Sequence, residues 1–121
     1  MARFRLSRPA QTDLACILSS SLERWGSAGQ RRYATLLTTA MRVVAKEPQS
    51  FVTRDRADLQ SGLRSFHLRQ VRADDRRAMV RRPVHVIYYR EIQAGLVEIV
   101  RILHERMEPS RWLRASSDEE E

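Results

Sequence analysis

The sequence predicts an α+β fold in which an N-terminal strand and an antiparallel helical hairpin pack on a small, mostly antiparallel sheet. Three observations predict it. Apolar side chains recur every three or four positions across residues 9–47, the periodicity of amphipathic helices. β-Branched and aromatic residues dominate residues 84–90 and 96–103. Residues 3–7 alternate between apolar and polar side chains, as a half-buried strand does. The expected order is β-α-α-β-β-β, with two helices layered on one sheet.

The boundaries of the helical hairpin follow from its capping and turn residues. Ser7 can cap a helix that follows the first strand, and Pro9 is tolerated in the first helical turn. Gly26 ends the first helix and Pro48 ends the second. A connection of about two residues requires the helices to run antiparallel. The apolar stripes at helical spacing consist of Leu14, Ile17, Leu18, Leu22 and Trp25, and of Tyr33, Leu36, Leu37, Ala40, Met41 and Val44.

The second half of the chain changes to strand periodicity. A loosely alternating strand is expected at residues 63–68, and the short loop 93–95 joins the last two strands as a β-hairpin. The connection 69–82 is longer than an ordinary hairpin loop of about 2–5 residues. Its six arginines and two aspartates carry a charge of +4. We expect either strands that extend into a projecting ribbon or a mobile loop.

Composition and charge describe a small cationic protein. The 121 residues include 22 basic and 15 acidic side chains, which give a net charge of +7. Without the four acidic residues that end the chain, 22 basic side chains face 11 acidic ones, and the remainder carries +11. No apolar run approaches the roughly 18–20 residues of a membrane span, and no signal peptide follows the first methionine. We expect a cytoplasmic protein with one domain, 1–113, and an acidic flexible tail, 114–121.

Cysteine and histidine usage argues against a metal or cofactor site. Cys16 is the only cysteine, which excludes an internal disulfide and a zinc site of several thiolates. His67, His85 and His104 lie on three different expected strands, and none is part of a metal-binding spacing. We expect structural histidines, no metal and no cofactor. Asp13 is expected to be a solvated helix charge.

The C-terminal third carries a specific motif. Residues 95–108 read Gly-Leu-Val-Glu-Ile-Val-Arg-Ile-Leu-His-Glu-Arg-Met-Glu and are followed by Arg111-Trp112-Leu113. This run resembles the C-terminal signature of ParE-type toxins of the ParE/RelE superfamily. In that signature a hairpin loop leads into a strand that ends in Ile/Val-Leu-His-x-Arg-Met-Asp/Glu, with a basic residue shortly after.

Weaker similarities extend the resemblance over residues 3–113. Residues 6–14 are similar to the start of the family's first helix, and Trp25-Gly26 is similar to its helix–helix turn. Residues 62–66 and 85–90 fall where the family's middle strands are expected. The resemblance implies a helical hairpin on a small antiparallel sheet, in agreement with the order reached from periodicity.

The resemblance implies a toxin of a type II toxin–antitoxin system, a class associated with plasmid stabilization. ParE-like toxins act on DNA gyrase, block replication and are neutralised by a ParD-like antitoxin. Their RelE-like relatives instead cleave messenger RNA on the ribosome. A third alternative is an inactive relative that only binds an antitoxin.

The residues favour inhibition by binding over enzymatic cleavage. A metal-free ribonuclease needs a base, an acid and cations for the developing phosphorane charge. The expected middle strand offers Arg64 and Arg69 but no lysine, and His85 stands where the family has an arginine. Trp112 replaces a C-terminal tyrosine and has no ionisable proton to give. Arg106 is the clearest match to the RelE constellation, but ParE-like sequences also have an arginine there. We therefore predict no catalytic residues.

Two surfaces are candidates for protein contacts. The segment after the last strand is rich in side chains that are enriched at interfaces. Its candidates for toxicity and target binding are His104, Arg106, Met107, Arg111 and Trp112. Alternatively, Met107 and Trp112 close the open end of the core. The groove along the helical hairpin and sheet edge could accept an amphipathic helix and an extended segment of an acidic antitoxin. Its candidates are Leu14, Leu18, Leu37 and Met41.

The arginine-rich connection offers a third set of contacts. It could touch DNA held by gyrase through the phosphates, without reading base sequence. The candidates are Arg72, Arg76, Arg77, Arg81 and Arg82. Tyr88 and Tyr89 should point to opposite faces of their strand, so that one is in the core and the other is free for a contact.

Overall fold

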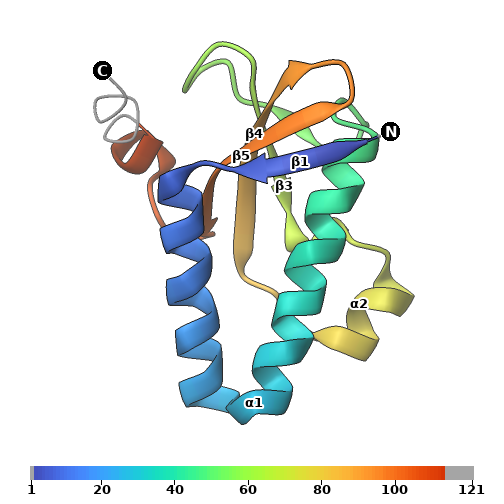
Figure 1. Cartoon of the computed structure of the whole chain (residues 1–121), viewed down its shortest axis with the longest axis vertical. Helices are drawn as coiled ribbons and strands as arrows, with labels where there is room; N and C mark the ends of the chain where they lie inside the picture. Colours follow the sequence, from blue (N-terminus) through green and yellow to red (C-terminus); the bar gives the residue numbers. More distant parts are fainter. Residues whose placement is uncertain (1, 114–121) are drawn as a thin grey trace.

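A computed structural model describes residues 2–113, apart from the side chains of residues 77 and 78. The α+β class is confirmed, with a helical hairpin packed on one five-stranded sheet (Figure 1). The predicted acidic tail, 114–121, lies outside the described residues. The elements are β1 (Arg3–Leu6), α1 (Arg8–Lys46), β2 (Arg54–Asp55), β3 (Leu63–His67), η1 (Leu68–Gln70), α2 (Ala73–Met79), β4 (His85–Gln93) and β5 (Leu96–His104).

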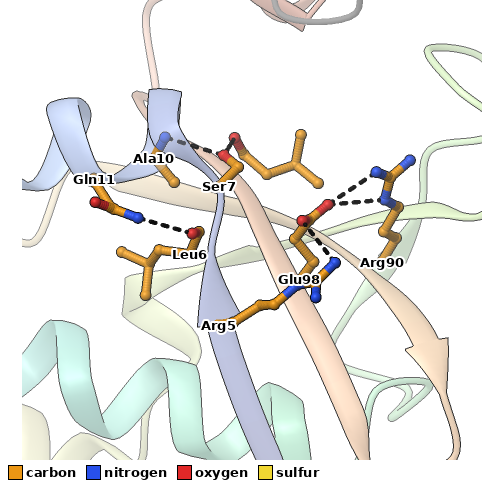
Figure 2. Close-up of polar contacts among 8 residues, drawn as sticks. Arg5, Leu6, Ser7, Ala10, Gln11, Arg90 and Glu98 are labelled. Carbon is orange, nitrogen blue, oxygen red and sulfur yellow. Dashed lines mark hydrogen bonds and ion pairs between the residues drawn. The ribbon is translucent and has the colours of Figure 1, made fainter. Parts of the chain in front are cut away.

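Ser7 caps α1 as the sequence predicts and also connects the helix to the sheet. Its hydroxyl accepts a hydrogen bond from the Ala10 backbone N–H at 3.1 Å and donates one to the Val100 carbonyl at 2.8 Å. The Gln11 side chain donates to the Leu6 carbonyl at 3.1 Å (Figure 2). These bonds satisfy helix-terminal groups and determine the angle at which β1 leads into α1.

The predicted hairpin is confirmed by a break within α1. Gly26 has φ 74°, a left-handed conformation that is favourable for glycine, and the two arms of α1 run antiparallel on either side of it (Figure 1). The amide of Gln30 in the second arm donates to the Leu18 carbonyl of the first at 3.0 Å. A backbone turn and a side-chain bond therefore both hold the tip of the hairpin.

The strand order is β1-β5-β4-β3-β2. β1 is parallel to β5, and every other pair is antiparallel, so the mostly antiparallel sheet is confirmed. Glu98 of β5 lies opposite Arg5 of β1 and Arg90 of β4 and pairs with both, at 3.4 Å and 2.9 Å (Figure 2). This charge triad crosses three strands and supports their register.

The two faces of the sheet are covered by different parts of the chain. The larger core cluster lies between α1 and the sheet and includes Tyr33, Leu36 and Tyr89. A smaller cluster on the other face consists of Leu63, Tyr88, Val100, Leu103 and Leu113. Tyr88 and Tyr89 do point to opposite faces, but both are buried. The expectation that one of them is free for a contact is therefore wrong, because the C-terminal segment covers the second face.

The apolar stripe of the first helix is only partly covered. Ile17 is buried and Leu14 and Leu18 pack against the larger core, whereas Leu22 and Trp25 are 46% and 53% exposed. The tip of the hairpin extends past the strands (Figure 1). Helical periodicity identifies this face of the helix but not the length of sheet available to cover it.

The arginine-rich connection does not extend the strands into a projecting ribbon. It forms η1 and the short helix α2, which lies beside the second arm of α1 (Figure 1). Val71, Met79 and Val80 pack against the larger core. Asp74 and Asp75 occupy the first turn of α2, where negative charge favours a helix. The apolar residues thus anchor a segment whose length suggested that it would project from the fold.

Candidate functional site

A nearly buried ion pair joins the first helix to the last strand. Both nitrogens at one edge of the Arg101 guanidinium donate to the Asp13 carboxylate, at 2.7 Å and 2.8 Å. The same carboxylate accepts the Ile102 backbone N–H at 2.9 Å. The Arg101 and Asp13 side chains are only 12% and 13% exposed. The expectation that Asp13 is a solvated helix charge is therefore wrong, because the α1·β5 packing buries it against a complementary arginine.

Arg101 also holds the segment that follows β5. Its third nitrogen donates to the Trp112 carbonyl at 3.1 Å, and its guanidinium carbon lies 5.7 Å from the centre of the Trp112 ring, within cation–π range. We call Asp13, Arg101 and Trp112 the C-terminal clamp. An arginine inside the most apolar strand is the sequence signal that could have indicated it.

The clamp presents most of the predicted target-binding residues on one exposed segment. Arg106, Met107, Arg111 and Trp112 are all exposed. Leu113 is buried in the smaller cluster and ends this segment. Leu113 therefore closes the core here, whereas Met107 and Trp112 are each 41% exposed.

His104 belongs to a different environment from the other four candidates. Its ring lies 5.6 Å from that of His85, nearly perpendicular to it, and its Nδ1 accepts the Arg106 backbone N–H at 3.1 Å. The Tyr33 hydroxyl lies 2.6 Å from Nδ1 of His85 and accepts the Val84 backbone N–H at 3.3 Å. A tyrosine and two histidines from α1, β4 and β5 are thus brought together.

Burial keeps Tyr33 and His85 neutral at pH 7. Desolvation raises the pKa of Tyr33 to about 12. Desolvation, together with the nearby His104 and His67, lowers the pKa of His85 to about 4. The Tyr33 hydroxyl therefore keeps its proton. Because its oxygen already accepts the Val84 N–H, we assign it as the hydrogen-bond donor to Nδ1 of His85.

These aromatic side chains line the inner part of a pocket near the tip of the hairpin. A cavity of about 350 Å³ is bounded by α1, β4 and the end of β5, and a second of about 460 Å³ adjoins it beneath α2. Both are lined by Trp25, Tyr33 and Arg82. We call the combined site the basic pocket, and define it by Arg24, Trp25, Arg32, Tyr33, Arg81, Arg82, His85 and His104.

His67 lies outside the basic pocket and bonds to Glu105. Nε2 of His67 lies 2.7 Å from a Glu105 oxygen, and this hydrogen bond lowers the pKa of the Glu105 carboxyl. Within residues 2–113, no group of three or more His, Cys, Asp or Glu side chains is arranged to hold a metal ion. Cys16 is exposed.

The structure separates the predicted basic contacts. Arg81 and Arg82 line the basic pocket, whereas Arg72 is exposed at the start of α2. Arg76 is partly buried and donates to the Arg69 carbonyl at 2.6 Å. The side chain of Arg77 lies outside the described part of the chain. Sequence reasoning missed Arg24 and Arg32, which join this site only because the hairpin folds back toward α2.

The predicted antitoxin contacts are also divided. Leu14 and Leu18 are partly buried on α1, but Leu37 and Met41 are 0% and 3% exposed and have no surface to offer a partner in this structure. A separate hollow of about 620 Å³ lies between the start of the chain and the end of α1. It is lined by Ala2, Arg3, Phe4, Arg42, Ala45 and Lys46.

Comparisons with known proteins place these features in a family. Among the described helices, none is long and apolar enough to cross a membrane. A family model described as the ParE toxin of the type II toxin–antitoxin system parDE matches residues 4–109. The chain is similar to Toxin ParE1 from two strains of Mycobacterium tuberculosis, CDC 1551 / Oshkosh and ATCC 25618 / H37Rv. Each is 27% identical over 112 residues, which cover 93% of this chain and 98% of the relative.

A solved structure described as the chromosomal ParDE TA system from P. aeruginosa has a similar fold. The superposition has a TM-score of 0.60 at 15% identity and covers 86% of this chain and 96% of the other. At this identity the similarity concerns the fold alone. The family match, in contrast, covers most of the chain, including the residues that form the clamp up to Arg101 and the basic pocket. The chain therefore belongs to the family of ParE toxins of type II toxin–antitoxin systems.

Proposed function

We propose that this toxin inhibits DNA gyrase in the cytoplasm by binding to it, without chemistry of its own, and thereby blocks replication. The observation that carries the proposal is the family match over residues 4–109. The exposed segment held by the C-terminal clamp supports it, because arginine, methionine and tryptophan are typical of the energetically important part of protein interfaces. Arg106, Met107, Arg111 and Trp112 are the proposed contacts.

Purified protein and gyrase test this proposal directly. We expect micromolar toxin to inhibit supercoiling of relaxed plasmid and to accumulate gyrase-cleaved DNA. Normal supercoiling at that concentration would contradict the proposal. The same protein is added to a translation extract, where codon-specific cuts in messenger RNA that disappear in Arg106→Ala would indicate the RelE-like activity instead.

Matched substitutions locate the contact surface. Met107 and Ile92 are both large apolar residues, 41% and 40% exposed, but only Met107 lies on the C-terminal segment. We expect Met107→Ala to weaken gyrase inhibition at least tenfold and Ile92→Ala to leave it within twofold. Equal effects of the two substitutions would place the contact elsewhere.

We also propose that a ParD-like antitoxin neutralises the toxin by covering α1 and the β1 edge of the sheet. β1 is the first strand of the sheet order, so its outer backbone groups can pair with an extended segment. The neighbouring hollow combines apolar Phe4 with basic Arg3, Arg42 and Lys46, which suits an acidic, partly apolar peptide. Leu14 and Leu18 remain the proposed contacts for an amphipathic helix.

Charge reversal tests this surface. Arg42 lines the hollow, whereas Arg31 is an exposed arginine on the same helix that lines none of the cavities described above. We expect Arg42→Glu to weaken binding of a ParD-like antitoxin encoded beside the toxin at least tenfold, and Arg31→Glu to change it less than threefold. Calorimetry with purified proteins measures both. Unchanged affinity in Arg42→Glu would exclude the hollow from the antitoxin interface.

A further inference from the structure

We propose that the basic pocket binds a phosphorylated mononucleotide, with its phosphates held by arginine and imidazole N–H groups and its base stacked on Trp25. This site lies apart from the exposed C-terminal segment and does not depend on gyrase binding. The inference rests on the charge, the hydrogen-bonding pattern, the aromatic surface and the shape of the pocket.

The charged side chains that line the pocket are all positive. Arg24, Arg32, Arg81 and Arg82 line it, and no aspartate or glutamate does. Among the described residues, none of these four guanidinium groups has an ion pair or side-chain hydrogen bond. Arginine is well suited to phosphate, because its planar donors match two phosphate oxygens at once.

Two imidazoles supply N–H donors at the base of the pocket. Nδ1 of His85 is occupied by the Tyr33 hydroxyl, and Nδ1 of His104 by the Arg106 backbone N–H. These bonds assign the remaining proton of each ring to Nε2. Both rings line the same cavity, so it contains two further N–H groups suited to an anionic oxygen.

Trp25 provides an accessible aromatic surface beside these donors. Its side chain is half exposed and its ring lies 6.2 Å from that of Tyr33. Gly29 permits this placement, because a Cβ atom at residue 29 would lie 2.3 Å from Cβ of Trp25. Bases stack on exposed tryptophan without regard to their identity, so the pocket need not prefer one base.

The shape suits a small ligand better than an acidic peptide. The adjoining cavities of about 350 and 460 Å³ fall in the range of about 300–1,000 Å³ that is usual for small-molecule sites. β4 and β5, which form one wall, are each paired with strands on both sides. The strand residues that line the pocket, His85 and His104, pair with each other, and we expect recognition here to rely on side-chain donors.

Tryptophan fluorescence can test the proposal with the full chain. Trp25 and Trp112 are the two tryptophans, and Trp112→Phe leaves Trp25 as the only reporter while preserving the backbone carbonyl that Arg101 uses. We expect ATP to quench Trp25, AMP to bind more weakly, and adenosine to bind at least tenfold more weakly than ATP. Calorimetry on the unsubstituted protein gives the same order without a fluorescent reporter.

Matched arginine variants test the site itself. Arg31 and Arg32 are adjacent and exposed on α1, but only Arg32 lines the pocket. We expect Arg32→Ala and Arg82→Ala each to weaken ATP binding at least fivefold, and Arg31→Ala to change it less than twofold. Circular dichroism confirms that each variant is folded. Trp25→Ala, measured by calorimetry, should weaken ATP binding but leave the binding of inorganic triphosphate unchanged.

Three outcomes would overturn the proposal. The first is the absence of quenching and of heat at millimolar ATP. The second is equal loss of affinity in Arg31→Ala and Arg32→Ala, which would indicate general attraction of an anion to a cationic protein. The third is tighter binding of a short polyglutamate peptide than of ATP, which would assign the pocket to an acidic protein segment.

Discussion

The C-terminal clamp and the basic pocket use the same residue type for opposite purposes. Arg101 is nearly buried, and its guanidinium group bonds to the Asp13 carboxylate and to the Trp112 carbonyl. The pocket arginines, such as Arg32 and Arg82, are exposed and line a cavity that contains no carboxylate. Arg101 uses its N–H donors within the protein, whereas the donors of the pocket arginines are available for a ligand.

This difference separates stability from binding. A buried charge that loses its partner is strongly destabilising, because the remaining charge can neither be solvated nor neutralised. An exposed charge without a partner contributes little to folding, and its hydrogen-bonding groups remain available for a ligand. Net charge alone cannot make this distinction, since both kinds of arginine contribute equally to the +7 of the chain.

Breaking the clamp should have the largest effect on stability. We expect Asp13→Ala to lower the free energy of unfolding by about 3–5 kcal/mol, because Arg101 remains buried without its carboxylate. Urea denaturation measures the change. The double variant Asp13→Ala/Arg101→Met should lose less than the sum of the two single variants, since it removes both charges. A loss below about 1 kcal/mol in Asp13→Ala would show that the pair is solvated.

Acidification should destabilise the basic pocket through His85. The native pKa is about 4 and the reference pKa is 6.5, so the unfolded state binds more protons between these values. Stability should therefore be lost as pH falls from 6.5 to 4, by at most about 3 kcal/mol from this residue. His85→Asn should reduce the slope of unfolding free energy against pH in this window, and removal of His67 should reduce it less, because His67 contributes to the lowered pKa of His85 without being its largest cause. The same slope in unsubstituted protein and His85→Asn would assign the effect to other groups.

Loss of the charge triad around Glu98 should lower the free energy of unfolding by less than loss of the clamp and by more than loss of a pocket arginine. Glu98 is buried, but its partners Arg5 and Arg90 are largely exposed. We expect Glu98→Gln to lower stability by about 1 kcal/mol, with a smaller difference in 1 M salt because screening weakens these pairs. Chemical denaturation at two salt concentrations tests this. If Glu98→Gln lost as much stability as Asp13→Ala, the exposure of the paired arginine would not determine how much an ion pair contributes to stability.

The smallest effect on stability is expected for the pocket arginines. Arg32→Ala and Arg81→Ala should each change the free energy of unfolding by less than about 0.5 kcal/mol, because neither side chain has a partner to lose among the described residues. Thermal denaturation gives the comparison with Asp13→Ala. Destabilisation by more than about 1 kcal/mol would show that these side chains support α2, and the contrast with the clamp would fail.

Elements that depend on local sequence were predicted well. The Ser7 cap, the Gly26 turn and the β4–β5 hairpin were found from capping chemistry, backbone preference and periodicity, each of which acts over a few residues. The helix within the connection 69–82 was not predicted, because the charge of this segment masked three apolar anchors, Val71, Met79 and Val80. Their burial depends on contact with α1, which lies far away in the sequence.

The sequence by itself thus determined the α+β class, the helical hairpin and the resemblance to ParE toxins, because local preferences and a contiguous motif carry that information. The short elements β2 and α2 were not predicted. Only the tertiary structure decided which charges are paired. Asp13 and Arg101 are 88 positions apart and meet at 2.7 Å. Arg24, Arg32 and Arg82 line one site because the hairpin folds back on itself. Pairing of charges depends on distance in space and on burial, and neither quantity is set by the spacing of residues along the chain.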